Sequence, residues 1–421
     1  MKYAQDLSGI AQAFESEPLR GKDLEVFYID DTMPIRMGEN HVSPMQDIFE
    51  SCKQTKHQNV HILLGHHGCG KSTELNILKQ QLENSGHKVS VVECKIETDI
   101  LGITYWDLLI LLGKHLCAIA EDTQCPLPEL LLKKIDEFWN EIEVVQTVHF
   151  DRNLGIKGKL SALFLGLSSE LKWGYDKRTT IRERVRKSAA LWIGYMNEVS
   201  DHLTRHLYGK QPIVIFEDLD KLSADKAWEV FDNPLSQMSF PIIYTLHICL
   251  SYAPKFRRVE DSFNTHILPM IKIRDLNGNP FDSGMNTIKS IIKKRADLSL
   301  FDEEALEFLI EKTGGVLRDL FRCILQAAAR TVTRKAERIE LEDAQSATNR
   351  LSSSLSRRIE TKNYPLLINI YNGAKYKEQI DDKEMLLDMM QGLIVLEYNG
   401  QRWHDLHPLI EDFLKKHGDV T

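Results

Sequence analysis

The sequence has no apolar run long enough to span a membrane. Its longest, Leu108 to Ala120, is interrupted by Lys114 and His115, whereas a transmembrane helix needs about 20 predominantly apolar residues. The first residues also lack the apolar core of a secretory signal peptide. We therefore expect a cytoplasmic protein without membrane contact.

Paired cysteines and excess positive charge are also missing. The seven cysteines are scattered and form no C-x-x-C pair, which favours free thiols over a disulfide framework. Lysine and arginine number 53 against 61 acidic residues, a net charge of −8. This argues against a general polyanion binder, although a local basic patch stays open. With 421 residues, 43% of them hydrophobic, the chain is long enough for two or three domains with sizeable cores.

The stretch with the clearest chemistry runs from Gly65 to Thr73 and fits the Walker A pattern G-x-x-x-x-G-K-[ST]. An apolar run (60–64) precedes it and a helical pattern (74–82) follows. Glycines let backbone N–H groups turn inward as a phosphate nest, and the following helix adds its positive N-terminal end. We expect all residues of this P-loop to bind nucleotide: Gly65, His66, His67, Gly68, Cys69, Gly70, Lys71, Ser72 and Thr73.

Two side chains of the P-loop have roles of their own. The Lys71 ammonium can reach the β- and γ-phosphates, and the Ser72 hydroxyl can be a ligand of Mg²⁺. The sequence thus predicts ATP and Mg²⁺ as ligands, although no short signature separates ATP from GTP. A metal site made of His66, His67 and Cys69 is a weaker alternative, because the backbone around them is already committed to phosphate.

A second signal is the Walker B pattern, in which the apolar run Ile213 to Phe216 ends in Glu217 and Asp218. Ligands of open parallel sheets bind at the carboxyl ends of strands. We place Glu217 at the metal and Asp218 beside the water that attacks the γ-phosphate, with Asp220 as an outer candidate. The usual first acid is aspartate, so the metal assignment between Glu217 and Asp218 stays open.

Other polar residues follow later strands. Thr245, in a predicted strand (241–248), could contact the γ-phosphate or be an ordinary satisfied hydroxyl. Arg257 and Arg258 precede the next predicted strand (266–271). An arginine at such a place could reach the nucleotide of a neighbouring subunit, although two exposed surface charges are the simpler interpretation.

Alternating strands and helices predict an α/β fold, a P-loop parallel sheet with helices on both faces, over 31–285. A lead-in (1–30) precedes it, and within the lead-in 25–29 is expected to be an edge strand or, alternatively, to pack beside the nucleotide base. A helical lid over 286–351 and a C-terminal winged helix over 352–421 follow.

Residues 121–190 do not fit the strand–helix rhythm and are interpreted as an insertion. It contains a helical pattern (130–144), a hairpin signal between 148 and 173, and a basic segment (172–187). The basic segment could contact a partner chain or nucleic acid, but a solvated helix start is the simpler interpretation.

The lid is predicted from four helical patterns. The second, Asp302 to Lys312, begins with acids and ends at Gly314 and Gly315, as a helix should. Arg318 lies near the start of the third. Its side chain could swing onto the phosphates and report which nucleotide is bound, or it could be an exposed first-turn arginine.

The last part of the chain is expected to begin with a polar linker, 352–354. Two helical patterns then precede alternating apolar residues around Asn399 and Gly400, the strongest short hairpin signal. Helices followed by a hairpin predict a winged helix. Nine basic and eleven acidic residues over 352–421 give a net charge of −2, which argues against a dedicated DNA-binding wing.

Taken together, these motifs resemble the additional-strand P-loop ATPases of the AAA+ and STAND type, in particular the origin-recognition-like and NB-ARC-like proteins. The run Gly314 to Arg318 is similar to the second sensor of AAA+ lids. The run Trp403 to Leu409 resembles a histidine motif that senses ADP in NB-ARC proteins, which makes His404 and His407 candidates. The run His67 to Leu75 also resembles P-loops of bacterial ATPases from mobile and defence loci.

We therefore expect a switch that binds ATP and Mg²⁺ between core and lid and hydrolyses ATP slowly. Its ATP state would form a homo-oligomer or engage a partner protein, and bacterial antiviral defence is the setting that the resemblance implies. The alternative is a DNA-binding AAA+ loader or initiator that uses the winged helix and the basic segment (172–187). A third hypothesis is a scaffold that binds nucleotide without turnover.

Overall fold

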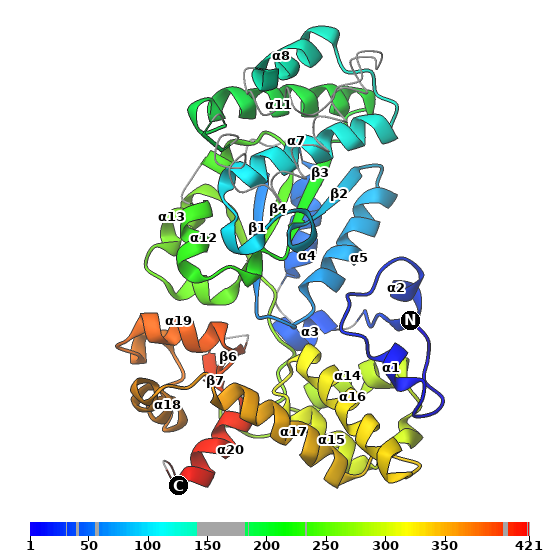
Figure 1. Cartoon of the computed structure of the whole chain (residues 1–421), viewed down its shortest axis with the longest axis vertical. Coiled ribbons are helices and arrows are strands. Elements are labelled where there is room, and N and C mark those ends of the chain that lie inside the picture. Colours follow the sequence, from blue (N-terminus) through cyan, green and yellow to red (C-terminus); the bar gives the residue numbers. More distant parts are fainter. Residues whose placement is uncertain are drawn as a thin grey trace.

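The fold is described from a computed structural model of the chain. Figure 1 shows a central sheet domain, with the lid helices and a C-terminal unit side by side at one end of it. The described residues are 1–30, 32–38, 42–54, 59–140, 182–183, 185–231, 234–398, 403–418 and 420.

The core is a five-stranded parallel sheet with the order β2-β3-β4-β1-β5. Every residue of β1, β3 and β4 is buried, as expected for central strands covered on both faces. Strand β4 separates the P-loop strand β1 from the acidic strand β3, which is the additional strand of the predicted ATPase class. The bounds are β1 Val60–Gly65, β2 Lys88–Glu93, β3 Pro212–Glu217, β4 Ile242–His247 and β5 Asn264–Ile267.

Helices cover the sheet, which confirms the predicted α/β fold. Helix α7 packs on β2 and β3, α11 packs on α7, and α8 packs on α11. The predicted helix in the insertion is present as α8, whereas the hairpin signal (148–173) and most of the basic segment lie outside the described residues. The described α-helices of this domain are α4 Pro44–Lys53, α5 Lys71–Asn84, α6 Cys94–Glu97, α7 Tyr105–Asp122, α8 Glu129–Asn140, α11 Ala189–His206, α12 Ala224–Phe231 and α13 Phe256–Ser262.

The expected edge strand at 25–29 is wrong, because this stretch contributes to helix α2, Lys22–Phe27. Leu24 and Phe27 are buried three residues apart while Val26 between them is 54% exposed, which is a helical period. Short helices α1, Ile10–Ala13, and α3, Thr32–Met37, flank it. These N-terminal residues pack on the lid and on α5 (Figure 1).

Four lid helices are present, namely α14 Asp282–Arg295, α15 Glu303–Lys312, α16 Leu317–Arg334 and α17 Leu341–Ser356. The polar linker expected at 352–354 is wrong, since α17 runs through it. The Ser353 hydroxyl donates to the Asn349 carbonyl at 2.8 Å, and such back-bonding lets a serine stay within a helix.

The C-terminal unit is consistent with the predicted winged helix. Two helices precede an antiparallel hairpin, and a last helix follows it. The hairpin turn, 399–402, lies outside the described residues. Of the helices that the structure describes, none is long and apolar enough to cross a membrane. The C-terminal elements are α18 Tyr364–Tyr371, α19 Lys383–Gln391, β6 Val395–Tyr398, β7 Trp403–Leu406 and α20 Pro408–His417.

Candidate functional site

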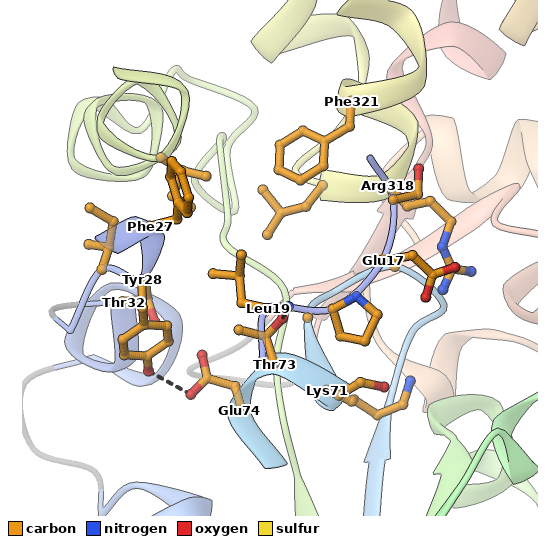
Figure 2. Close-up of a pocket in the computed structure, with 18 of the residues that line it drawn as sticks. Glu17, Leu19, Phe27, Tyr28, Thr32, Lys71, Thr73, Glu74, Arg318 and Phe321 are labelled. Carbon is orange, nitrogen blue, oxygen red and sulfur yellow. Dashed lines mark hydrogen bonds between the residues drawn. The ribbon is translucent and has the colours of Figure 1, made fainter. Parts of the chain in front are cut away.

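A cavity lies where the P-loop, the N-terminal residues and the lid meet. Figure 2 shows Lys71 and Thr73 of the P-loop at one part of it, and Phe321 and Phe27 at another. Of the predicted P-loop residues, those that line it are Gly68, Gly70, Lys71, Ser72 and Thr73; Gly65, His66, His67 and Cys69 are not among the lining residues.

The P-loop needs glycine at two places. Gly68 and Gly70 have φ values of +76° and +106°, which side chains disfavour. A Cβ on Gly68 would lie 2.6 Å from the Cβ of Arg318. The glycine therefore permits both the loop conformation and the close approach of the lid.

Lys71 begins α5 and is 6% exposed. Its ammonium donates to the carbonyls of Gly65 and His66, both at 2.9 Å, and lies 2.8 Å from the Asp220 carboxylate. All three partners belong to the protein. Bound phosphates would therefore have to replace some of them.

Asp220 lies in a 3₁₀ turn, Leu219–Lys221, directly after β3. Its Oδ2 contacts both the Lys71 ammonium and, at 3.1 Å, Nδ1 of His67. Burial acts to raise the pKa of Asp220, but the Lys71 charge and the His67 hydrogen bond outweigh it and hold that pKa well below its ordinary value. Asp220 is thus a carboxylate that lines the cavity.

The other two acids after β3 lie elsewhere. Glu217 is 4% exposed, and its Oε1 has no hydrogen-bond partner among the described residues. Burial, with the nearby Asp218 charge, raises its pKa to about 7. Asp218 has a φ of +72° and pairs with Lys221 at 2.5 Å. Neither acid lines the cavity, so the structure brings Asp220 to Lys71 instead.

The site can be tested for a fit to Mg²⁺. No three His, Cys, Asp or Glu side chains of the described residues converge on a metal position. A nucleotide-bound Mg²⁺ needs only one or two protein oxygens, because phosphates and waters supply the rest. Ser72 lines the cavity, and the orphaned Oε1 of Glu217 is a buried acceptor at the end of β3. Ser72 therefore fits the ion and would hold it, whereas Glu217 lies outside the cavity lining.

Thr245 has a structural partner. Its buried hydroxyl donates to the Phe216 carbonyl at 3.2 Å, which favours the satisfied-hydroxyl alternative. His247, at the carboxyl end of the same strand, was missed by sequence reasoning. Its ring centroid lies 4.7 Å from that of His67 and 5.4 Å from that of His66. His247 could have been found in the sequence as a polar residue at the end of a predicted central strand.

The other end of the cavity is lined by apolar residues of the N-terminal segment and the lid. The Leu19 N–H donates to Thr73 Oγ1 at 3.3 Å, and the Tyr28 hydroxyl donates to Glu74 at 2.8 Å. These bonds fix the segment against α5. Phe27 and Tyr28 of this segment line the cavity (Figure 2), and Phe321 lines it from the lid.

Two buried arginines in the lining were not predicted. Arg36 is 2% exposed and donates to the Pro269 carbonyl at 2.5 Å. Arg295 is 5% exposed, donates to the Ala13 carbonyl at 3.0 Å and lies over the Phe321 ring. Neither belongs to a short motif identified in the sequence.

Arg318, the sensor candidate, contacts the P-loop and lines the cavity. It lies in the first turn of α16, its backbone N–H donates to the Gly68 carbonyl at 3.4 Å, and its side chain lines the cavity (Figure 2). Arg257 and Arg258, by contrast, are exposed on α13.

His404 and His407 are buried within the C-terminal unit and do not line the cavity. His407 caps α20, because its Nδ1 accepts from the Leu409 N–H at 3.2 Å. The ring of His404 lies 6.1 Å from that of Tyr252. The structure therefore gives both histidines packing roles.

The C-terminal hairpin contacts the P-loop and the lid. Nε2 of His66 accepts from the Glu397 backbone N–H at 2.8 Å, and the Tyr398 hydroxyl donates to the Gly314 carbonyl at 2.9 Å. Both bonds are buried. The P-loop is thereby attached to a strand that lies far away in the sequence.

No family model and no curated protein match the chain. Solved structures with a similar arrangement include Cdc6p from Pyrobaculum aerophilum (12% identity, 94% of this chain, 99% of that chain, TM-score 0.39). A Walker-type ATPase of Pyrococcus abyssi has 14% identity, coverage of 96% and 99%, and a TM-score of 0.44. The ORC2 protein of Aeropyrum pernix has 12% identity, coverage of 97% and 98%, and a TM-score of 0.37.

Proposed function

We propose that the chain is an ATP-binding switch of the AAA+/STAND type that hydrolyses ATP slowly and, in its ATP state, assembles or engages a partner protein. The observation that carries this proposal is the attachment of the P-loop to both the lid and the C-terminal hairpin. Gly68 contacts the lid through Arg318, and His66 contacts the C-terminal hairpin through Glu397.

The coupling begins at Lys71. Its ammonium holds the His66 carbonyl at 2.9 Å, while the His66 ring holds the hairpin. Phosphates that attract this ammonium would remove its contact with His66. A ligand shifts an equilibrium only through contacts that differ between states, and this exchange is such a difference.

The lid supplies a second contact that would differ between the ATP state and the ADP state. Arg318 lines the cavity beside the P-loop, so its charge can stabilise a triphosphate more than a diphosphate. Mg²⁺, when bound by Ser72, would neutralise phosphate charge. Slow turnover is supported by the two acids predicted to act in hydrolysis. Asp218 is already paired with Lys221, and the pKa of Glu217 is raised to about 7.

The identity of the partner rests on weaker grounds. A homo-oligomer is supported by Arg257 and Arg258, which are exposed on α13. The NB-ARC-like character, the role in bacterial defence and the cytoplasmic location rest on the sequence alone.

The DNA-binding loader is the less favoured alternative. Arg182, from the basic segment, forms an ion pair with the buried Asp107, so at least one of these charges serves the fold. The loader hypothesis predicts duplex binding that weakens steeply with salt. Absence of binding at low salt would exclude it.

The switch is tested by measuring solution mass by light scattering, and hydrogen exchange of residues 395–398, without nucleotide, with ADP and with a non-hydrolysable ATP analogue. We expect the analogue, but not ADP, to raise the mass or to speed exchange in β6. A chain with the same mass and the same exchange in all three states would contradict the proposal.

The variant Arg318→Ala tests how much the lid contributes to the preference for ATP over ADP. We expect the preference for the ATP analogue over ADP to fall by about 1–3 kcal/mol, the usual size of an allosteric coupling. Arg322→Ala is the matched control, because Arg322 lies one turn later on α16 and its side chain is 60% exposed. Equal effects of the two variants would argue against a sensor.

A further inference from the structure

The three acids that follow β3 differ in which way they face. Glu217 lies beside Arg20 and Glu93, outside the cavity lining, and Asp218 pairs with Lys221. Asp220 lines the cavity next to the P-loop. Its Oδ2 lies 2.8 Å from the Lys71 ammonium, the group that would bind the β- and γ-phosphates.

This contact locates Asp220 relative to the substrate. A triphosphate offers Lys71 several anionic oxygens, so the ammonium would turn toward them. The side of Oδ2 that Lys71 now occupies would then face the terminal phosphate. A carboxylate oxygen in this place can accept a hydrogen bond from a water molecule.

His67 fixes the orientation of Asp220. A carboxylate only accepts hydrogen bonds, so Nδ1 of His67 must donate in its 3.1 Å contact with Oδ2. The His67 ring also packs on the His247 ring. Asp220 would therefore keep one fixed partner after Lys71 has moved to the phosphates.

We propose that Asp220 orients the water that attacks the terminal phosphate, and that His67 is the residue that positions Asp220. This assignment rests on the proposed ATP hydrolysis. It differs from the sequence-based expectation, which gave the water to Asp218.

The step involves no change of oxidation state. The water oxygen forms a bond to the γ-phosphorus while the bond from this phosphorus to the bridging oxygen breaks, and the electron pair leaves with ADP. The water proton ends on the released phosphate or in solvent. Asp220 accepts a hydrogen bond throughout and keeps its charge, so its contribution is orientation.

The test compares single-turnover ATP hydrolysis and ADP affinity in the full-length chain, with thermal melting as a check on folding. We expect Asp220→Asn to slow hydrolysis on the order of 100-fold, as lost positioning can, without weakening ADP binding, since Lys71 loses a competing anion. Asp225→Asn, an exposed acid on α12, is the matched control.

Two variants of His67 separate positioning from packing. His67→Ala removes the donor to Asp220 and should slow hydrolysis roughly tenfold or more, as loss of an outer partner does. His67→Asn places an amide donor near the former Nδ1 and should restore most of the rate. If Asp220→Asn fails to fold, this pair decides the question.

Four outcomes would overturn the assignment. One is an Asp218→Asn variant that stops hydrolysis while Asp220→Asn does not. Another is a His67→Asn variant as slow as His67→Ala. A wild-type chain that binds ADP but hydrolyses no ATP would remove both the assignment and the proposed turnover, whereas active wild-type protein with unchanged Asp220→Asn removes the assignment alone.

Discussion

The two ends of the nucleotide cavity are built in different ways. The phosphate end comes mainly from one continuous loop, 65–73, in which polar groups sit at fixed spacing. The other end is assembled from separate segments, with Leu19 and Phe27 before the core and Ile291 and Phe321 after it. Phosphate needs particular donors, whereas the opposite end needs mainly apolar surface.

The two ends are also attached to opposite parts of the chain. The phosphate end is bonded to the C-terminal hairpin through His66 and Glu397. The opposite end is closed by N-terminal residues, where Phe14 packs on Phe321 with centroids 5.5 Å apart and the Arg295 guanidinium donates to the Ala13 carbonyl. A ligand that fills the cavity would therefore contact regions that are joined to different ends of the protein.

The largest effect should come from the phosphate end. Lys71→Ala removes the buried ammonium, and we expect ADP and ATP-analogue affinity to fall by roughly 100-fold or more, about 3 kcal/mol. Isothermal titration calorimetry measures this loss. Lys79→Ala, two turns later on α5 and partly exposed, is the control. Intact affinity in Lys71→Ala would mean that the nucleotide site has been misplaced.

The opposite end should affect only the part of the ligand that reaches it. Phe321→Ala removes an aromatic wall, and we expect ADP to bind roughly tenfold more weakly while inorganic pyrophosphate binds as before. The free energy of unfolding should also fall by about 3 kcal/mol.

Phe308→Ala provides the control for this comparison. Phe308 packs on the same lid core but does not line the cavity. It should therefore lower stability without changing ADP affinity. Equal losses of ADP and pyrophosphate binding in Phe321→Ala would show that the two ends are not separate.

The smallest effect should be on the pH dependence of stability, through His66, which attaches the phosphate end to the C-terminal hairpin. Burial, followed by the nearby charges of Lys71 and His67, lowers the pKa of His66 from 6.5 to about 3. Because the unfolded chain binds this proton more readily, the contribution of His66 is fully present above pH 6.5 and is lost as the pH falls, by up to about 1.4 kcal/mol per pH unit.

His66→Gln keeps an acceptor for the Glu397 N–H but cannot titrate. Urea unfolding at pH 7 and pH 5 should therefore show a smaller loss of stability in this variant than in the wild type. His417→Gln, at an exposed position at the end of α20, should leave the wild-type difference unchanged. Identical pH dependence in His66→Gln and wild type would speak against the buried, neutral His66.

The sequence predicted what depends on residue type and spacing. The strand–loop–helix around Lys71, the buried strand before Glu217 and the lid position of Arg318 were all expected, and the structure has β1, α5, β3 and α16 there. Glycine in a left-handed conformation, four apolar residues in a row and a helix stop at Gly314 are local signals. Local signals of this kind can be interpreted without knowledge of the tertiary contacts.

What depends on tertiary contacts was missed. Val26 to Ile29 has strand-like composition, yet Leu24 and Phe27 find partners that make the stretch helical. The serines at 352–354 look like a linker but lie inside α17. Asp220 looked peripheral because it follows the strand by three residues, and only the turn at Leu219–Lys221 brings it back to Lys71.

The bond between His66 and Glu397 also has a consequence for how the protein is made. Its two partners lie 331 positions apart, so most of the chain must be synthesised before it can form. During translation, the P-loop would emerge early and stay without this partner while the lid is still being made. Contacts of such high sequence separation form slowly. Folding of the nucleotide site would thus be completed late, once the hairpin has left the ribosome.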